Sequence, residues 1–129
     1  MSIEPGIIGE LTLVVAEEHT AARYGSGLAP VFSTPHMIAL LEGAAAAAVE
    51  SQLAEGQSTV GTLVNVQHLA ATPIGMTIRA RAELLEVDRR RLRYRVEAWD
   101  EVEKIAEGEH ERFIIDYARF MAKVGEKQA

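Results

Sequence analysis

The chain has 129 residues, nearly half of them hydrophobic, and a formal net charge of −6. This size and composition fit one globular domain with one core, so we expect a single domain over residues 1–129. The negative charge argues against general nucleic-acid binding, because neutralising a phosphate backbone needs lysine and arginine clustered over a whole face. The absence of cysteine excludes disulfides, thiolate zinc sites and a cysteine nucleophile.

The N-terminal stretch MSIEPGIIGELTLVV lacks the basic start, long apolar run and cleavage site of a signal peptide. The most apolar segment, MIALLEGAAAAAVE, is interrupted by Glu42 and is too short to span a bilayer. We therefore predict a cytoplasmic protein without a membrane partner.

The first half of the chain predicts one strand, one loop and one long helix. Residues 9–19 alternate apolar and other side chains, as a strand with one better-buried face does. Residues 20–30, rich in Gly, Ala and Pro, predict a loop that could act as a lid. The helix is expected to follow, with Thr34 as its N-cap, Pro35 at its first position and Gly56 as its stop.

After Gly56 the pattern changes to period two, which predicts strands at residues 58–69, 76–87, 91–99 and 104–118. Short connections between them favour an antiparallel meander. Two of the strands have clear inward faces, formed by Ile78, Ala80, Ala82 and Leu84 and by Leu92, Tyr94, Val96 and Ala98. This order predicts an α+β fold in which a curved antiparallel sheet of five strands wraps around one long central helix; an open sandwich with the helix on one face is the alternative.

Glu42 lies within or beside the apolar stripe of the predicted helix. A carboxylate in such a place can serve as a general base or nucleophile, because burial and neighbouring charges tune its pKa. The alternative is a glutamate at the margin of the stripe that reaches solvent.

Three further residues have one structural and one chemical interpretation. An unbroken register places Val60, Thr62, Val64, Val66 and His68 on the face that meets the helix, where His68 is either a histidine at the edge of the core or a proton carrier. Thr34 caps the helix or assists an oxyanion at the positive helix end. Gly61 marks a bulge or close approach of a ligand, or is simply a glycine near a turn.

His36 and His110 have no histidine at metal-ligand spacing, so we predict no metal. The sequence also lacks a GxSxG motif, a phosphate loop and a dinucleotide fingerprint, and we predict no cofactor. The densest basic region could bind a phosphate-rich ligand such as coenzyme A, or could be a solvated strand face; it comprises Arg79, Arg81, Arg89, Arg90, Arg91, Arg93 and Arg95.

Three segments together resemble the fluoroacetyl-coenzyme A thioesterase family of the hot-dog fold superfamily: VFSTPHMIALLEGAA, GTLVNVQHLAATPIGMTIRARAEL and GEHERFIIDYARFMAKV. The likeness extends from about Val31 to Val124. It implies a hot-dog fold, an acyl-CoA substrate and a homodimer, or dimer of dimers, with active sites at the subunit interface. It also implies catalytic roles for Thr34, Glu42 and His68.

Substrate-binding residues carried over from this likeness are Gly61, whose N–H would polarise the thioester carbonyl, and Arg112 of the HER motif, which could equally form a structural ion pair. The family's aromatic lid is longer than residues 20–30, which offer mainly Tyr24 and Leu28. We therefore expect hydrolysis of short or medium acyl-CoA esters without strong preference for fluoroacetyl. A non-catalytic acyl-CoA binding module and a hot-dog dehydratase are the alternative functions.

The helix spacing raises a geometric problem for these assignments. Thr34 and Glu42 are eight residues apart, so a rise of about 1.5 Å per residue separates them by roughly 12 Å along one helix. Either a second subunit supplies one of them, or His68 bridges part of the distance.

Overall fold

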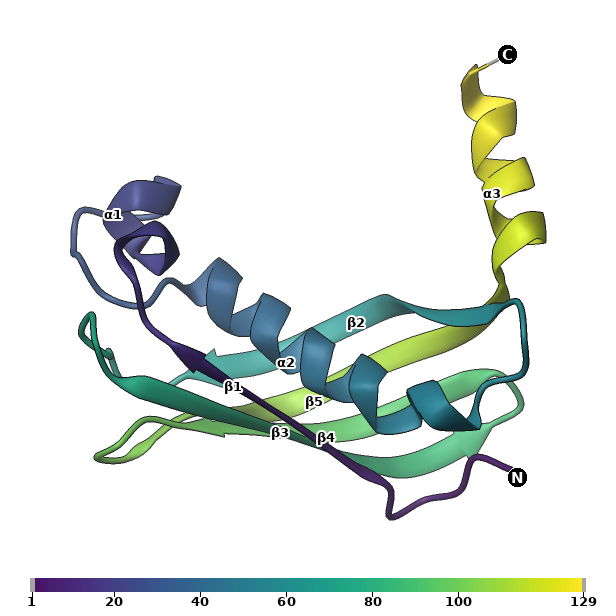
Figure 1. Ribbon diagram of the computed structural model, residues 1–129, viewed down its shortest axis with the longest axis horizontal. Coiled ribbons are helices and arrows are strands. Elements are labelled where there is room, and N and C mark those ends of the chain that lie inside the picture. Colours follow the sequence, from purple (N-terminus) through teal and green to yellow (C-terminus); the bar gives the residue numbers. More distant parts are fainter. Residues whose placement is uncertain (1, 129) are drawn as a thin grey trace.

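The computed structural model describes residues 2–128 and shows one curved sheet with a long helix lying in its concave face (Figure 1). The strands are β1 (Ile8–Val14), β2 (Gln57–His68), β3 (Thr77–Asp88), β4 (Arg91–Trp99) and β5 (Lys104–Asp116). All neighbouring strands are antiparallel, in the order β1-β3-β4-β5-β2. The predicted curved sheet around one helix is therefore confirmed, and β1 and β2 form its two edges.

The central helix α2 (Thr34–Val49) continues into a short 3₁₀ turn, Glu50–Gln52. Its N-cap is Ser33, whose hydroxyl accepts a hydrogen bond from the backbone N–H of His36. The predicted cap, Thr34, was wrong by one residue, because Ser33 has the extended backbone and the hydroxyl position that a cap needs. Thr34 is thus the first helical residue, and its hydroxyl is not used for capping.

The core lies between α2 and the sheet, where the helix packs against the strands. The predicted inward faces of β3 and β4 are confirmed, because all eight side chains are fully buried. Gly9 of β1 lies so close to the carbonyl of Ala44 that a Cβ atom there would overlap it. The small residues of α2 therefore let the helix backbone approach this edge of the sheet.

The predicted face of β2 was only partly right. The pairing of β2 with β5 shifts between Gly61 and Leu63, so Thr62 is an extra residue at a β-bulge. Val66 and His68 keep the predicted inward direction, whereas Val60 pairs opposite the exposed Phe113 on the outer face. An unbroken alternation could not anticipate this, because a bulge reverses the facing of every residue on one side of it.

Two helical segments were not predicted. Part of the expected loop at residues 20–30 forms a short helix, α1 (Ala21–Tyr24), preceded by a 3₁₀ turn, Glu17–His19. The last strand ends at Asp116, and helix α3 (Tyr117–Gly125) follows it, ending in a 3₁₀ turn, Glu126–Gln128. In Figure 1, α1 and α3 rise from opposite ends of the body on the same side. None of the helices within residues 2–128 has the length and apolar character needed to cross a membrane.

Candidate active site

Thr34 and His68 meet at the N-terminal end of α2. Helix α2 begins at Thr34 and strand β2 ends at His68, so the ends of two elements bring the side chains together. The Thr34 Oγ1 atom lies 2.7 Å from His68 Nδ1, a short hydrogen bond. A hydroxyl paired with an imidazole in this way is the arrangement that activates an alcohol as a nucleophile.

This pair borders a cavity of about 690 Å³. The cavity has a mainly apolar lining, to which Val31, Phe32, Pro35 and Ile38 contribute. Ala21 and Ser26 of the segment before α2 also line it. An apolar cavity with one convergent polar pair is typical of a small-molecule site. The segment predicted as a lid therefore does border the site.

The His68 imidazole is tuned towards its neutral form. Burial lowers its pKa below the ordinary value, and the backbone of Ala70 partly opposes this effect. A neutral imidazole with Nδ1 unprotonated accepts the hydroxyl proton of Thr34, and Nε2 then carries the ring proton. Among the described residues, the buried Nε2 atom has no hydrogen-bond partner.

Glu42 belongs to a second polar group, in the middle of α2. Its Oε2 atom accepts a hydrogen bond from Arg112 Nη1 at 3.4 Å, and its side chain remains 39% exposed. Gly61 lies directly opposite, because a Cβ atom there would be 2.5 Å from Glu42 Oε2. Arg112 also donates from Nε to Thr59 Oγ1 and from Nη2 to the carbonyl of Thr59, each at 2.9 Å.

The structure therefore divides the predicted site residues into two groups. Thr34 and His68 form one, and Glu42, Gly61 and Arg112 form the other. Tyr24 belongs to neither: it packs edge-on against His36, with ring centroids 5.3 Å apart, and does not line the cavity. Its contact with substrate stays a prediction, as do the roles of the other five residues.

Sequence reasoning missed the cap residue Ser33 next to this site and His110 within the second polar group. The serine before the Thr-Pro pair was available as a cap, which frees the threonine. His110 lies beside Arg112, with its Nε2 atom 3.2 Å from Arg112 Nη1. Alternation along β5 could have placed His110 and Arg112 on one face, but the pattern of that strand was too irregular to assign.

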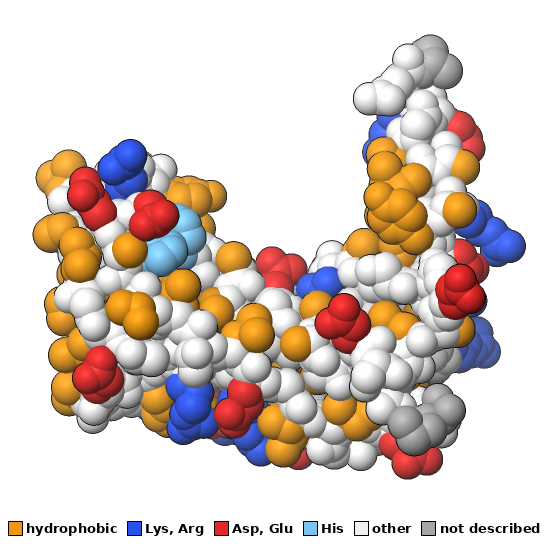
Figure 2. Space-filling model, in the orientation of Figure 1, with side chains coloured by type: hydrophobic (Ala, Val, Ile, Leu, Met, Phe, Trp, Pro, Cys, Tyr) orange, Lys and Arg blue, Asp and Glu red, His pale blue; other side chains and the backbone are white. Residues whose placement is uncertain are grey.

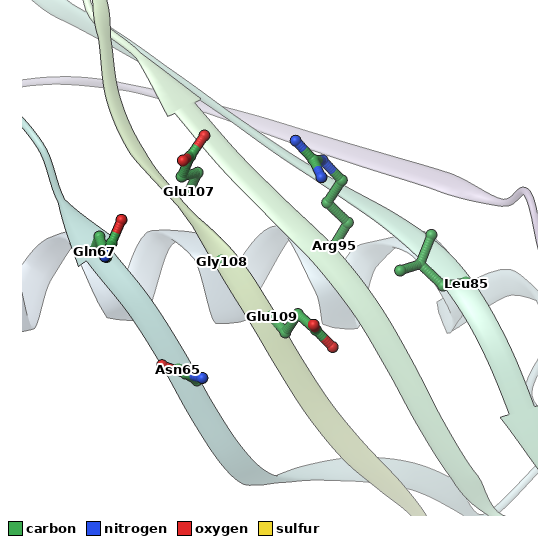
Figure 3. Close-up of a pocket in the computed structure, with 7 residues that line it drawn as sticks. All are labelled: Asn65, Gln67, Leu85, Arg95, Glu107, Gly108 and Glu109. Carbon is green, nitrogen blue, oxygen red and sulfur yellow. The ribbon is translucent and has the colours of Figure 1, made fainter.

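The outer face of the sheet holds the arginine-rich region. Arg93 donates to Glu86 and Glu109 at 3.0 Å, and Arg91 pairs with Glu111 at 3.1 Å. A shallow hollow of about 340 Å³ on this face is lined by side chains of both charges, including Arg95, Glu107 and Glu109 (Figure 3). Around Arg91, Arg93 and Arg95 the paired charges are typical of a solvated strand face, and binding of a phosphate-rich ligand by the arginine-rich region stays a prediction. Within residues 2–128, no group of three or more His, Asp or Glu side chains could hold a metal ion.

Comparison with known proteins identifies the family of the chain. Residues 15–118 match the family model described as fluoroacetyl-CoA-specific thioesterase (FlK). A fluoroacetyl-CoA thioesterase from Streptantibioticus cattleyicolor is 44% identical over 97 residues, which cover 75% of this chain and 70% of that protein.

Solved structures of thioesterases are also similar to this chain. The structure of fluoroacetyl-CoA thioesterase FlK superposes with a TM-score of 0.93 at 36% identity, covering 98% of each chain. A Thermus thermophilus member of the thioesterase superfamily is 29% identical, with a TM-score of 0.91 over 98% of this chain and 93% of its own. A hot-dog-like protein from Thermanaerovibrio acidaminovorans shares the fold, with a TM-score of 0.87. The chain therefore belongs to the fluoroacetyl-CoA-specific thioesterase family and has the hot-dog fold.

Proposed function

We propose that the protein is a cytoplasmic acyl-CoA thioesterase that hydrolyses short or medium acyl groups at a site shared between two subunits. The observation that carries this proposal is the short hydrogen bond between Thr34 and His68 at the edge of an apolar cavity. Thioester hydrolysis is the activity named for the family model and for the curated relative. A solved structure of an FlK variant contains fluoroacetate and CoA.

The chemistry follows from the two polar groups. Thr34 loses its hydroxyl proton to His68 Nδ1 and attacks the thioester carbonyl, and the backbone N–H of Gly61 stabilises the oxyanion. The C–S bond breaks, and the imidazolium returns a proton to the thiolate of CoA. Glu42 then acts as general base for the water that hydrolyses the acyl-threonine ester, which releases the acid and restores the hydroxyl.

One subunit cannot supply all of these groups to one carbonyl, because the helix rise separates Thr34 from Glu42 by roughly 12 Å. A second copy of the chain would solve this problem. Strand β2 is an edge of the sheet, and Leu63 and Val64 on it are exposed. An apolar edge of this kind favours pairing with another strand.

Helix α3 gives further support for pairing with a second copy of the chain. Its exposed apolar side chains, Tyr117, Met121 and Val124, follow helical spacing and form one stripe. In Figure 2, hydrophobic side chains of this projecting helix border the hollow between the two raised ends of the body. We therefore propose a homodimer in which two copies pair through β2 and the apolar stripe of α3 contacts the second copy.

Release of free thiol from a panel of acyl-CoA esters tests the proposed activity. We expect thiol release in proportion to the carboxylic acid formed. Binding of acyl-CoA without thiol release would instead identify a non-catalytic binding module. Formation of a double bond in a hydroxyacyl-CoA with the thioester intact would identify a dehydratase. Either result would refute the thioesterase proposal.

Mixing two inactive variants tests the shared site. In a mixed dimer of Thr34→Ala and Glu42→Gln subunits, a shared site has one intact copy and one doubly damaged copy. Random exchange then restores about a quarter of the activity of the unmodified protein, because half of the dimers are mixed and each has one of two sites. Sites contained within single subunits would stay inactive in every dimer. A mixture of Thr34→Ala with His68→Ala is the matched control, because these residues act as one pair and no intact copy forms.

A further inference from the structure

A buried histidine that the proposed reaction does not use lies behind Glu42. His110 of β5 is 1% exposed, and both of its ring nitrogens have partners. Its Nδ1 atom lies 2.7 Å from the carbonyl oxygen of Leu63, which directly follows the extra residue of the β2 bulge. Its Nε2 atom lies 3.2 Å from Arg112 Nη1.

These two contacts define the protonation state of His110. A carbonyl only accepts hydrogen bonds, so Nδ1 carries the ring proton and donates it to Leu63. A guanidinium only donates and stays protonated, so Nε2 is the bare acceptor for Arg112. His110 is therefore neutral, with a single tautomer that fits both partners.

The surroundings of His110 favour this neutral state. Burial and the charge of Arg112 lower its pKa, whereas the Leu63 carbonyl and the carboxylates of Glu42 and Glu111 act in the opposite direction, and the balance is a pKa below the ordinary value. The ring of Tyr94 on β4 stacks on the imidazole with centroids 6.1 Å apart, which restricts its rotation. A second proton would place an N–H on Nε2 against the N–H of Arg112.

Arg112 connects His110 with Glu42 through its hydrogen bonds. Its Nε and Nη2 atoms are held by Thr59, and its Nη1 atom is shared between His110 and Glu42. The imidazole thus supplies the second acceptor that fixes the direction of Nη1. We propose that His110 is a positioning residue, which orients the Arg112 guanidinium and through it the carboxylate of Glu42. This inference rests on the proposed thioesterase function only for its kinetic test.

Two substitutions test the hydrogen bonds of the two ring nitrogens of His110 separately. His110→Asn places an amide N–H near Nδ1 and keeps the bond to Leu63, but it removes the acceptor for Arg112. His110→Gln places an amide oxygen near Nε2 and keeps that acceptor, but it loses the bond to Leu63. We expect the asparagine variant to lower kcat about ten- to hundredfold, because misplacing a catalytic group by about 1 Å has this scale of effect. The glutamine variant should recover most of the lost activity.

Coupling to Glu42 distinguishes positioning from general structural support. In a Glu42→Gln background, His110→Asn should change kcat by less than about twofold, because the group that it positions has already lost its charge. Glu109→Gln on the outer face of the same strand is the matched control and should leave activity unchanged. Equal losses in the asparagine and glutamine variants, or an undiminished effect in the Glu42→Gln background, would overturn the proposal.

A spectroscopic test on the unmodified protein and the two His110 variants is independent of turnover. Nitrogen-15 spectra of the imidazoles should show His110 with a protonated Nδ1 and an unprotonated Nε2. The Arg112 side-chain N–H signals should shift in His110→Asn but stay close to their original positions in His110→Gln. The opposite tautomer, or unmoved arginine signals in the asparagine variant, would refute the positioning role. If no acyl-CoA is hydrolysed, the proposed function fails, and these spectra still decide the role of His110.

Discussion

Gly61→Ala is expected to displace Glu42 without removing any polar group of the site. The new Cβ atom would lie 2.5 Å from Glu42 Oε2, and 3.3 Å from both Arg112 Nη1 and His110 Cε1. Restoring ordinary contact requires the carboxylate to move by about 1 Å, which is the displacement that costs about a hundredfold in rate. We therefore expect kcat/KM for thiol release to fall by about two orders of magnitude.

The same substitution should have little effect on stability. The atom that must move is the far end of a partly exposed side chain, and Arg112 keeps its hydrogen bonds to Thr59 when the carboxylate shifts. Replacing glycine by alanine also restricts the unfolded chain, which contributes about 0.4–1 kcal/mol in the favourable direction. Calorimetry should therefore show a Tm within about 5 °C of the unmodified protein.

The control is Gly125→Ala, where an added Cβ meets nothing within 4 Å and activity should not change. Activity of Gly61→Ala close to that of the unmodified protein would show that Glu42 does not act from the position beside this strand. A large fall in Tm would show instead that the backbone at the bulge, and not the carboxylate, absorbs the added methyl group.

Removing an acid or base should lower turnover by about a hundredfold or more, so Glu42→Gln and His68→Ala should lose thiol release while circular dichroism shows a folded protein. Because the pKa of His68 is lowered, its basic form persists at neutral pH, and kcat/KM should fall only when the pH drops below that lowered value. His68 and His110 both have lowered pKa values in the folded state, so the unfolded chain binds more protons than the folded protein in mild acid. Denaturation with urea should therefore show that the free energy of unfolding decreases as the pH falls below about 6.5. Light scattering should show a dimer at micromolar concentration. Met121→Lys should weaken this dimer, whereas the control Val102→Lys, at the exposed β4–β5 turn, should leave it unchanged. A monomeric unmodified protein would contradict the shared site. Fluoroacetyl-CoA and acetyl-CoA should give similar kcat/KM values, because the short segment before α2 offers little aromatic surface to close the cavity; a preference of many thousandfold would refute this.

Strict period two made β3 and β4 predictable, because burial on one face selects apolar residues at every second position. β2 was harder to predict, since its alternation continues through Thr62 although the bulge reverses the facing there. Helix α3 was missed because FIIDYA continues the apolar pattern of β5 past Asp116, where the strand ends. In each case the local pattern was correct until a change of backbone geometry interrupted it.

The identities of the site residues could be predicted, but their partners could not. The pair of Thr34 with His68 joins residues 34 positions apart, and the pair of Glu42 with Arg112 joins residues 70 positions apart. No periodicity reports such distances, because they depend on how the sheet curves around the helix. The resemblance to a known family indicates the residue types, whereas their division into two groups follows from the folded structure.

The packing of α2 explains why the polar groups collect on one side of it. The helix packs closely on β1 and β3, where Gly9 and the small residues of α2 leave no space between the backbones. On the side of β2 its contacts are few, and Glu42 is partly exposed there opposite a glycine. A helix that packs closely on one side and is open on the other leaves a surface available to another molecule. Because this open side adjoins the unpaired edge of β2, the substrate and the second subunit are both expected there.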